Sequence, residues 1–137
     1  MNWVVQSSAV DFLHLLLVQM DHLIRTYKIR ARLSISIHDE VRYLVAEPDA
    51  PRLALALHLS NLFARAMFVH KLSMDDLPLS VAFFSAVDVD QVQRKEPTDD
   101  CLSPSCPRGL TSKFGIPLGE SLNIEECLKR TGGSLEK

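Results

Sequence analysis

The sequence of 137 residues has few cysteines, and their number and spacing argue against two kinds of site. Cys101, Cys106 and Cys127 form an odd and sparse set that does not suit a disulfide framework, so we expect reduced thiols in a reducing compartment. Four residues separate the first two cysteines and the third is distant, which is not the usual ligand spacing of a zinc site. A loop with free thiols is the expected arrangement.

An excess of basic charge is also missing. The chain has 15 Lys and Arg residues against 17 Asp and Glu residues, which gives a net charge of -2. A protein that grips nucleic acid by itself is expected to be clearly basic, because it must neutralise phosphates. The composition therefore gives no sign of a self-sufficient nucleic-acid binder.

Long apolar runs are absent as well. The longest, from Phe12 to Met20, is interrupted by His14 and Gln19 and is shorter than the ~20 residues that cross a bilayer. The N-terminal residues include Asp11, lack a basic leader and show no small-residue cleavage site. We therefore expect no membrane span, no secretory signal and no transit peptide in this chain.

The residues that are present predict one globular α+β unit, since 47% are hydrophobic and 23% are charged. Apolar residues recur every three or four positions from Asn2 to about Lys28, which predicts a long helix. The expected buried stripe of this helix consists of Val5, Ala9, Phe12, Leu16, Met20, Leu23 and Tyr27.

A change of period to two after Arg32 predicts an antiparallel β-hairpin. Its first strand is expected to place Leu33, Ile35 and Ile37 on one buried face, alternating with serines. Its second strand, from Val41 to Val45, follows after His38, Asp39 and Glu40, which are expected to form the tip.

A second helix is predicted from the breakers Pro48, Asp49 and Pro51 to about Lys71. Its expected stripe is Leu55, Leu59, Leu62, Ala66 and His70, widened by Ala56, Phe63 and Met67. Ser80 to Val87 is apolar on both faces, which predicts a third, central strand.

The remaining sequence predicts a loop-rich C-terminal tail. Residues 97–109 are rich in Pro, Ser, Asp, Thr and Gly, as in a surface loop. A short last helix is expected from Ser121, as N-cap, to Arg130, with Gly132 just beyond its end.

The candidate catalytic residues lie at the expected hairpin tip. Adjacent carboxylates such as Asp39 and Glu40 on a rigid hairpin can bind Mg²⁺, because this hard cation prefers oxygen ligands. Such ions stabilise in-line phosphoryl transfer. By spacing alone the pair is more typical of an ordinary solvated turn, because surface turns favour Asp.

Two motifs in the correct order distinguish these interpretations. ISIHDEV, residues 35–41, resembles the C motif of family A DNA polymerases, a palm hairpin that carries a His-Asp-Glu triplet. NWVVQSSAVD, residues 2–11, is similar to the helix that precedes that hairpin, with an Asn and a Gln four residues apart. DLPLSVAFFSAVD, FGIPLGE and GSLEK extend the similarity to the C-terminal end of the mitochondrial members of this family. The resemblance covers nearly the whole chain and is clearest from Asn2 to Glu96.

The resemblance implies a role for each matching residue. Asp39 would bind the catalytic Mg²⁺, Glu40 would support that site or its hydration, and His38 would lie near the primer terminus. Asn2 and Gln6, one helical turn apart, would contact the minor-groove side of the primer-template duplex, where every base pair presents an acceptor. Related single-subunit RNA polymerases have a Ser in place of Glu40, so this residue favours the DNA-polymerising branch.

Several parts of such an enzyme are not present in these residues. The second metal-binding Asp, the fingers helix that holds the incoming nucleotide, the thumb and any exonuclease are missing. We therefore expect residues 1–96 to be a partial palm, residues 97–137 a loop-rich extension, and the isolated chain to be an inactive C-terminal portion of the polymerase. The implied partners are primer-template DNA, deoxynucleoside triphosphates, the rest of the polymerase chain and an accessory subunit, in mitochondria.

Other interpretations stay open. The chain could be a non-catalytic, palm-like module that binds DNA or protein, or, with less support, a small metal-dependent hydrolase that uses Asp39 and Glu40. Asn2 could be a helix N-cap and Gln6 a plain exposed residue. Asp88 and Asp90 are expected to form a polar turn after the third strand. The histidines expected to be packed or solvated rather than ligands are His14, His22, His58 and His70.

Overall fold

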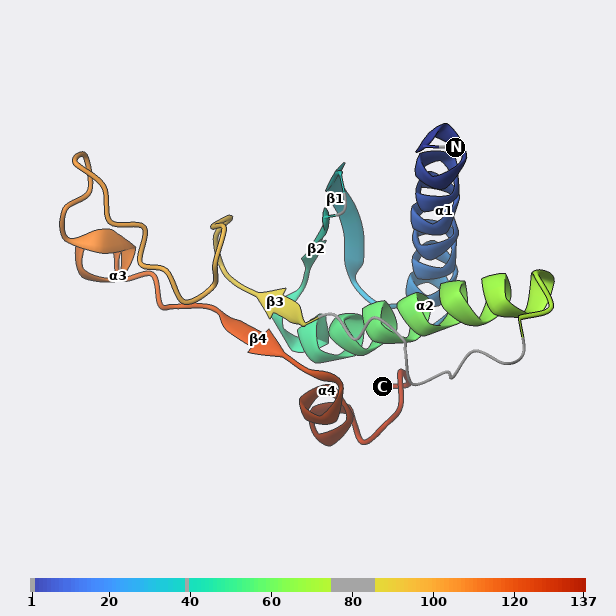
Figure 1. Cartoon of the computed structure of the whole chain (residues 1–137). Helices are drawn as coiled ribbons and strands as arrows, with labels where there is room; N and C mark the ends of the chain where they lie inside the picture. The colour runs from blue at the N-terminus through green and yellow to red at the C-terminus, as the bar shows by residue number, and fades with distance from the viewer. Residues whose placement is uncertain (1, 39, 75–85) are drawn as a thin grey trace.

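The computed structural model describes residues 2–38, 40–74 and 86–137 (Figure 1). Its elements confirm the α+β class and the expected order of helix, hairpin and helix. They are α1 (Asn2–Thr26), β1 (Ala31–Ile37), β2 (Glu40–Val45), the 3₁₀ turn η1 (Glu47–Asp49), α2 (Ala50–Lys71), β3 (Val87–Val89), α3 (Gly109–Phe114), β4 (Glu120–Leu122) and α4 (Ile124–Thr131). The central strand expected over residues 80–87 lies outside the described residues, apart from Ala86 and Val87.

The elements are arranged around α2. In Figure 1, α1 and the β1–β2 hairpin rise from one side of this helix, and α4 lies on its other side. β3 and β4 form a second antiparallel pair next to the start of α2, from which a lobe containing α3 extends away from the core. The hairpin tip and the N-terminal end of α1 therefore project in the same direction.

Left-handed residues end both long helices. Lys28 has φ 50°, and the Ile29 N–H donates to the Ile24 carbonyl at 3.0 Å, which is the six-residue closure typical of a helix C-terminus. Ser73 has φ 53° beyond α2, where the Met74 N–H donates in the same way to Val69. The first reversal turns the chain directly from α1 into β1.

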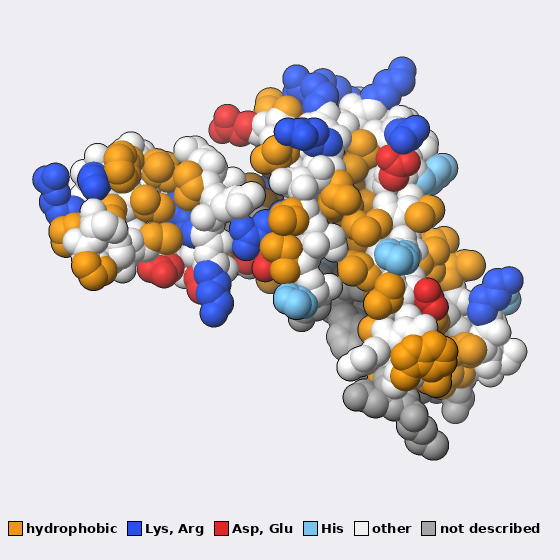
Figure 2. Space-filling view, turned by 90° about the horizontal axis from the view of Figure 1, so that it is seen from above, with side chains coloured by type: hydrophobic (Ala, Val, Ile, Leu, Met, Phe, Trp, Pro, Cys, Tyr) orange, Lys and Arg blue, Asp and Glu red, His pale blue; other side chains and the backbone are white. Residues whose placement is uncertain are grey.

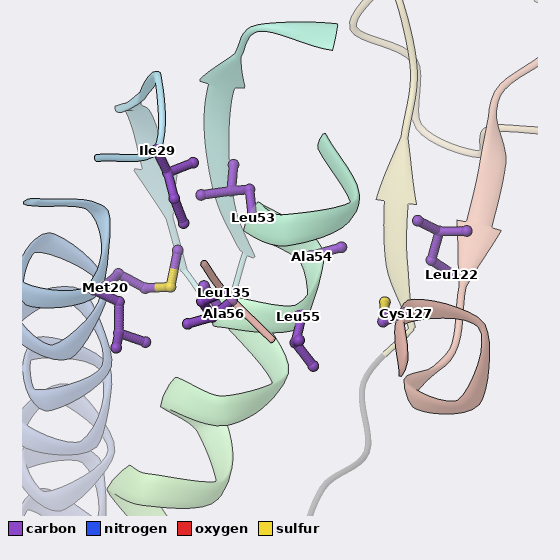
Figure 3. Close-up of a cluster of buried hydrophobic side chains, with 10 residues drawn as sticks. Met20, Ile29, Leu53, Ala54, Leu55, Ala56, Leu122, Cys127 and Leu135 are labelled. Atoms are coloured by element: carbon purple, nitrogen blue, oxygen red, sulfur yellow. The ribbon is translucent and has the colours of Figure 1, made fainter. Parts of the chain in front are cut away.

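The buried core lies where α1 ends and α2 begins. Met20, Leu23 and Ile29 come from the first of these segments, and Leu122, Cys127 and Leu135 come from the C-terminal part of the chain (Figure 3). Between them lie four consecutive residues of α2, Leu53, Ala54, Leu55 and Ala56. Burial of these side chains stabilises the fold by roughly 25 cal/mol for each Å² of apolar surface removed from water.

The predicted stripe of α2 was largely wrong. Of its members, only Leu55 and Ala56 are buried, whereas Leu59 is 40% exposed. The N-terminal half of α2 is covered by α1 on one side and α4 on the other, so it is buried nearly all round. A single stripe describes a helix with one covered face, and that condition fails here.

The stripe of α1 is buried only near the end of the helix. Met20 and Leu23 are in the core, but Val5 is 69% exposed because the N-terminal half extends beyond the rest of the described structure. Figure 2 shows hydrophobic side chains spread over much of the face seen from above, toward which α1 and the hairpin rise.

The C-terminal helix begins later than predicted. Asn123, not Ser121, is its N-cap, and its side chain accepts from the Glu126 N–H at 2.9 Å while Glu126 accepts from the Asn123 N–H. This reciprocal capping box fixes the start of α4, and Gly132 in the left-handed region ends it as expected. Ser121 instead belongs to β4, a strand that the sequence did not predict.

Within the described residues, two helical segments are long and apolar enough to cross a membrane, by length and composition alone. They are Trp3–Thr26 and Glu47–Lys71. Core helices of water-soluble proteins pass the same test, and 44% of the second segment is buried inside the fold, compared with 6% of the first. The absence of a membrane span stays a prediction.

Candidate active site

The hairpin connection is shorter than the sequence suggested. Ile37 pairs with Glu40 across the two strands, so Glu40 is the first residue of β2 rather than part of the tip. His38 has φ 53°, the left-handed conformation that two-residue hairpin connections require. Asp39, the expected metal ligand, lies outside the described residues. The described residues on either side of Asp39 are therefore the His38 imidazole in the connection and the Glu40 carboxylate at the start of β2, both exposed to solvent.

A β-bulge changes which side chains share a face of the hairpin. Leu33 pairs with Tyr43, but Ile35 pairs with Arg42, so β1 contains one extra residue, Ser34. The alternation therefore slips, and the single buried face expected for β1 was wrong. Leu33 and Ile35 are 43% and 42% exposed. The pairing instead places Glu40 and Arg42 on one face of β2, two residues apart.

Glu40 forms an ion pair with Arg42. The Arg42 Nε donates to Glu40 Oε1, and the two side chains are 31% and 57% exposed, respectively. Because the pair is open to water, it contributes little to the stability of the fold, about 0–1 kcal/mol. Arg42 was missed from the sequence, although the spacing of two on a strand places these opposite charges side by side.

A groove of about 1080 Å³ lies beside the hairpin. Its walls are α1 from Ala9 to Leu16, the residues 40–45 of β2, the first half of α2, and residues 86–97. His38, Glu40 and Arg42 all line it, so the tip chemistry opens into this groove. Residues 86–97 contribute Asp88 and Arg94 to the lining, so charged groups come from this segment as well as from the hairpin.

Asp88 and Asp90 differ in structure. Asp88 belongs to β3 rather than to a turn after a strand, which corrects the prediction for this residue. Asp90 does follow the strand and accepts a hydrogen bond from the Val92 N–H at 3.1 Å, as in a polar turn. Its carboxylate also contacts Arg94 Nε at 2.7 Å. Asp90 therefore stabilises the turn that follows β3.

The metal-ligand set is incomplete within the described residues. Over residues 2–38, 40–74 and 86–137, no group of three or more His, Cys, Asp or Glu side chains is close enough to hold an ion. Glu40 is a hard oxygen donor on an exposed strand end, which suits Mg²⁺ chemically. The donor type of Glu40 therefore fits the expected ion, and the binding of Mg²⁺ by Asp39 and Glu40 stays a prediction.

The expected DNA-contact residues lie on α1. Asn2 begins the helix and Gln6 is exposed one turn later. The helical backbone places these positions on one side of α1, as the spacing predicts. Their contact with a duplex stays a prediction.

The remaining histidines and cysteines do not form a site among the described residues. His14, His22 and His70 are exposed, and His58 is buried with its Nε2 3.3 Å from the Leu122 carbonyl, so all four match the expectation. The three cysteines are free thiols, as predicted. Burial raises the pKa of the Cys127 thiol, which keeps it protonated and unreactive.

Comparison with known proteins identifies the relatives of the chain. No protein-family model matches it. It is 60% identical over 136 residues to "DNA polymerase subunit gamma-1" of Gallus gallus, 51% identical to "DNA polymerase subunit gamma-1, mitochondrial" of Drosophila melanogaster, and 48% identical to "DNA polymerase gamma" of Saccharomyces cerevisiae. The similarity covers 99%, 97% and 99% of this chain, respectively. The chain is homologous to part of DNA polymerase gamma.

The chain spans only a small share of these polymerases. It covers 21% of the Gallus gallus relative, 11% of the Drosophila melanogaster relative and 10% of the Saccharomyces cerevisiae relative. The Drosophila melanogaster and Neurospora crassa relatives are both named as mitochondrial polymerases. The similarity extends over both the hairpin and the lobe that contains α3, so both belong to the segment shared with these relatives.

Proposed function

We propose that this chain is the C-terminal palm portion of the catalytic subunit of a mitochondrial DNA polymerase gamma. In that setting it takes part in DNA-directed transfer of nucleotides to a primer 3′ end. The observation that carries the proposal is the similarity of nearly the whole chain to polymerase gamma, combined with a hairpin whose His38 and Glu40 line a groove.

The hairpin supplies the reacting end of the proposed site. Asp39 and Glu40 would hold Mg²⁺, which when bound neutralises charge that develops on phosphate oxygens. His38 lines the groove, so it is available to contact the primer terminus. Two antiparallel strands fix the backbone on either side of the triplet, which limits the motion of these groups.

Helix α1 supplies the duplex contact. Asn2 and Gln6 would donate hydrogen bonds to the acceptors that all base pairs present in the minor groove. Such contacts sense the geometry of a pair and not its sequence. This side of the palm would therefore contribute to fidelity.

The rest of the polymerase would complete the site. Residues 1–96 would form part of the palm and residues 97–137 an extension to it. The exposed apolar side chains on the projecting half of α1, including Trp3 at 79%, would be covered by other parts of the polymerase chain or by an accessory subunit. Because the second metal-binding Asp and the fingers lie elsewhere, the isolated chain would not extend a primer.

Replacement of the hairpin carboxylate tests the proposal. In the Gallus gallus relative, this chain would replace the matching segment, and Asp39→Ala would be compared with Asp21→Ala, whose carboxylate forms an exposed ion pair with Arg25. We expect Asp39→Ala to abolish primer extension with Mg²⁺ while duplex binding is kept, and Asp21→Ala to keep both. Retained extension in Asp39→Ala would remove this residue from the metal site.

A further inference from the structure

The ion pair between Glu40 and Arg42 lies at the point where the hairpin meets the groove. The two side chains share one face of β2, line the groove together and are both open to solvent. The contact joins Arg42 Nε to Glu40 Oε1. No other hydrogen bond of the Arg42 guanidinium is formed within the part of the chain that the structure describes.

The energetics of the pair make it exchangeable. An exposed ion pair is worth about 0–1 kcal/mol, so the many phosphates of a polyanionic duplex can compete with the single Glu40 carboxylate for Arg42. A guanidinium has five donors in a planar fork that suits phosphate oxygens as well as carboxylates. Arg42 uses its Nε donor toward Glu40, and the other N–H groups of its planar guanidinium remain available at the edge of the groove.

The charged residues of the groove leave Arg42 as its accessible guanidinium. Arg42, Arg94 and Lys95 line the groove together with Glu40, Asp88 and Asp90, so basic and acidic side chains are equally represented among the described lining residues. Arg94 is held by Asp90 with its side chain 1% exposed, so its charge is already balanced within the fold. Arg42 is 31% exposed and is therefore the more accessible of these two guanidinium groups.

We propose that Arg42 is an exchangeable phosphate-binding residue. It pairs with Glu40 when the groove is empty and moves to a backbone phosphate of the primer-template duplex when the duplex binds. This movement frees the Glu40 carboxylate when the duplex is bound. The inference rests on the proposed function, because that function supplies the duplex.

A double-mutant cycle on duplex binding tests the exchange. The protein is the Gallus gallus relative carrying this chain, and the probe is a fluorescent primer-template duplex titrated across a salt series without metal or nucleotide. Arg42→Gln should weaken binding about fivefold, the loss of one charge-assisted hydrogen bond. It should also lower the salt slope by about one unit. Arg42→Lys should restore the slope and part of the affinity.

The variant Glu40→Gln distinguishes competition between Glu40 and the duplex for Arg42 from a general electrostatic effect of the Glu40 charge on duplex binding. If Glu40 competes for Arg42, then Glu40→Gln tightens duplex binding when Arg42 is present and has no effect in the Arg42→Gln background. An equal effect of Glu40→Gln in both backgrounds would show general electrostatics and overturn the exchange. Glu125→Gln, an exposed glutamate on α4, is the matched control and should leave binding unchanged.

Failure of the exchange is distinguishable from failure of the proposed function. Duplex binding is measured without metal and nucleotide, so the cycle can be read whether or not the chimera extends primers. Primer extension by the chimera without energetic coupling between Glu40 and Arg42 would reject the exchange alone. Coupling between the two residues without primer extension would support the exchange and reject the proposed catalysis.

A second titration, with a deoxynucleoside triphosphate and no duplex, should show no effect of Arg42→Gln. A loss there would assign Arg42 to the triphosphate and overturn the inference.

Discussion

Arg52 and Leu135 are 83 residues apart in the sequence, and Arg52 Nε donates a 2.9 Å hydrogen bond to the Leu135 carbonyl. The same guanidinium donates to the Tyr27 carbonyl at 2.8 Å and to Asp49 Oδ1 at 3.1 Å. Arg52 is buried at the start of α2. One side chain thus joins the end of α1, the start of α2 and the C-terminal tail.

Arg52→Ala should destabilise the chain by about 3 kcal/mol, because it leaves the buried Asp49 with one cation fewer and two carbonyl groups without their donor. Urea unfolding followed by circular dichroism measures the change. Arg25→Ala removes an exposed ion pair with Asp21 and should cost at most about 1 kcal/mol. Equal losses in the two variants would contradict a special role for Arg52.

The stability of the fold should fall in acid because of Asp49. Its carboxylate accepts hydrogen bonds from the Arg30 backbone N–H and side chain and from Arg52, and the Arg30 contact is the main reason that its pKa is lowered from 3.8 to about 2. A folded-state pKa below the unfolded value means that the stabilisation is complete above about pH 4 and is lost as the pH falls toward 2.

Urea midpoints at about pH 5 and about pH 3 test this dependence. Asp49→Asn should be less stable at the higher pH and should lose less stability on acidification than the unchanged chain. Some acid sensitivity should remain, since hydrogen bonds from Thr111 and Arg130 lower the pKa of Asp100 and Glu120, respectively. An unchanged pH profile in Asp49→Asn would assign the effect to those two residues.

Glycine is required at position 109 for two reasons, only one of which applies at position 115. Both residues have left-handed φ angles, 72° and 68°. A Cβ at Gly109 would lie 2.0 Å from Asp100 Oδ2, whereas a Cβ at Gly115 would meet nothing within 4 Å. Asp100 cannot move freely because its Oδ1 accepts from the Thr111 N–H and hydroxyl.

Gly109→Ala should therefore open the lobe, while Gly115→Ala should show only the strain of its backbone, about 1 kcal/mol. Hydrogen exchange at the Thr111 amide measures the opening, since this N–H is protected by Asp100. Similar exchange rates in both variants would mean that backbone strain alone determines the effect.

Local patterns predicted the elements better than their burial. The periods of three to four and of two located α1, α2 and the hairpin, because those periods are properties of the backbone. Burial depends on what covers each face, and α2 is covered on opposite sides by α1 and α4, which no local pattern reports. The bulge at Ser34 was invisible for the same reason: it is defined by the pairing with the other strand.

The residues of the candidate site were proposed from the sequence, whereas their contacts could not be predicted from it. His38 and Glu40 were identified from a short motif, and the structure places both beside one groove. The pairing of Glu40 with Arg42 depends on a strand register that begins at Glu40, which the expected three-residue tip had hidden. The hydrogen bond from Arg52 to the Leu135 carbonyl joins segments that are distant in the sequence, so no local spacing predicts it.

Gln6→Ala in the Gallus gallus relative carrying this chain should reduce fidelity more than it reduces affinity. Gln6 is exposed on α1, so its removal leaves the core unchanged. Loss of one hydrogen bond to a correctly formed terminal pair should slow extension from a matched primer about fivefold. A mismatched primer does not present its acceptor in the same place and should be affected less. Single-turnover extension from the two primers measures the ratio, with Gln19→Ala on the same helix as control. A ratio unchanged from that control would remove Gln6 from the sensing of base-pair geometry.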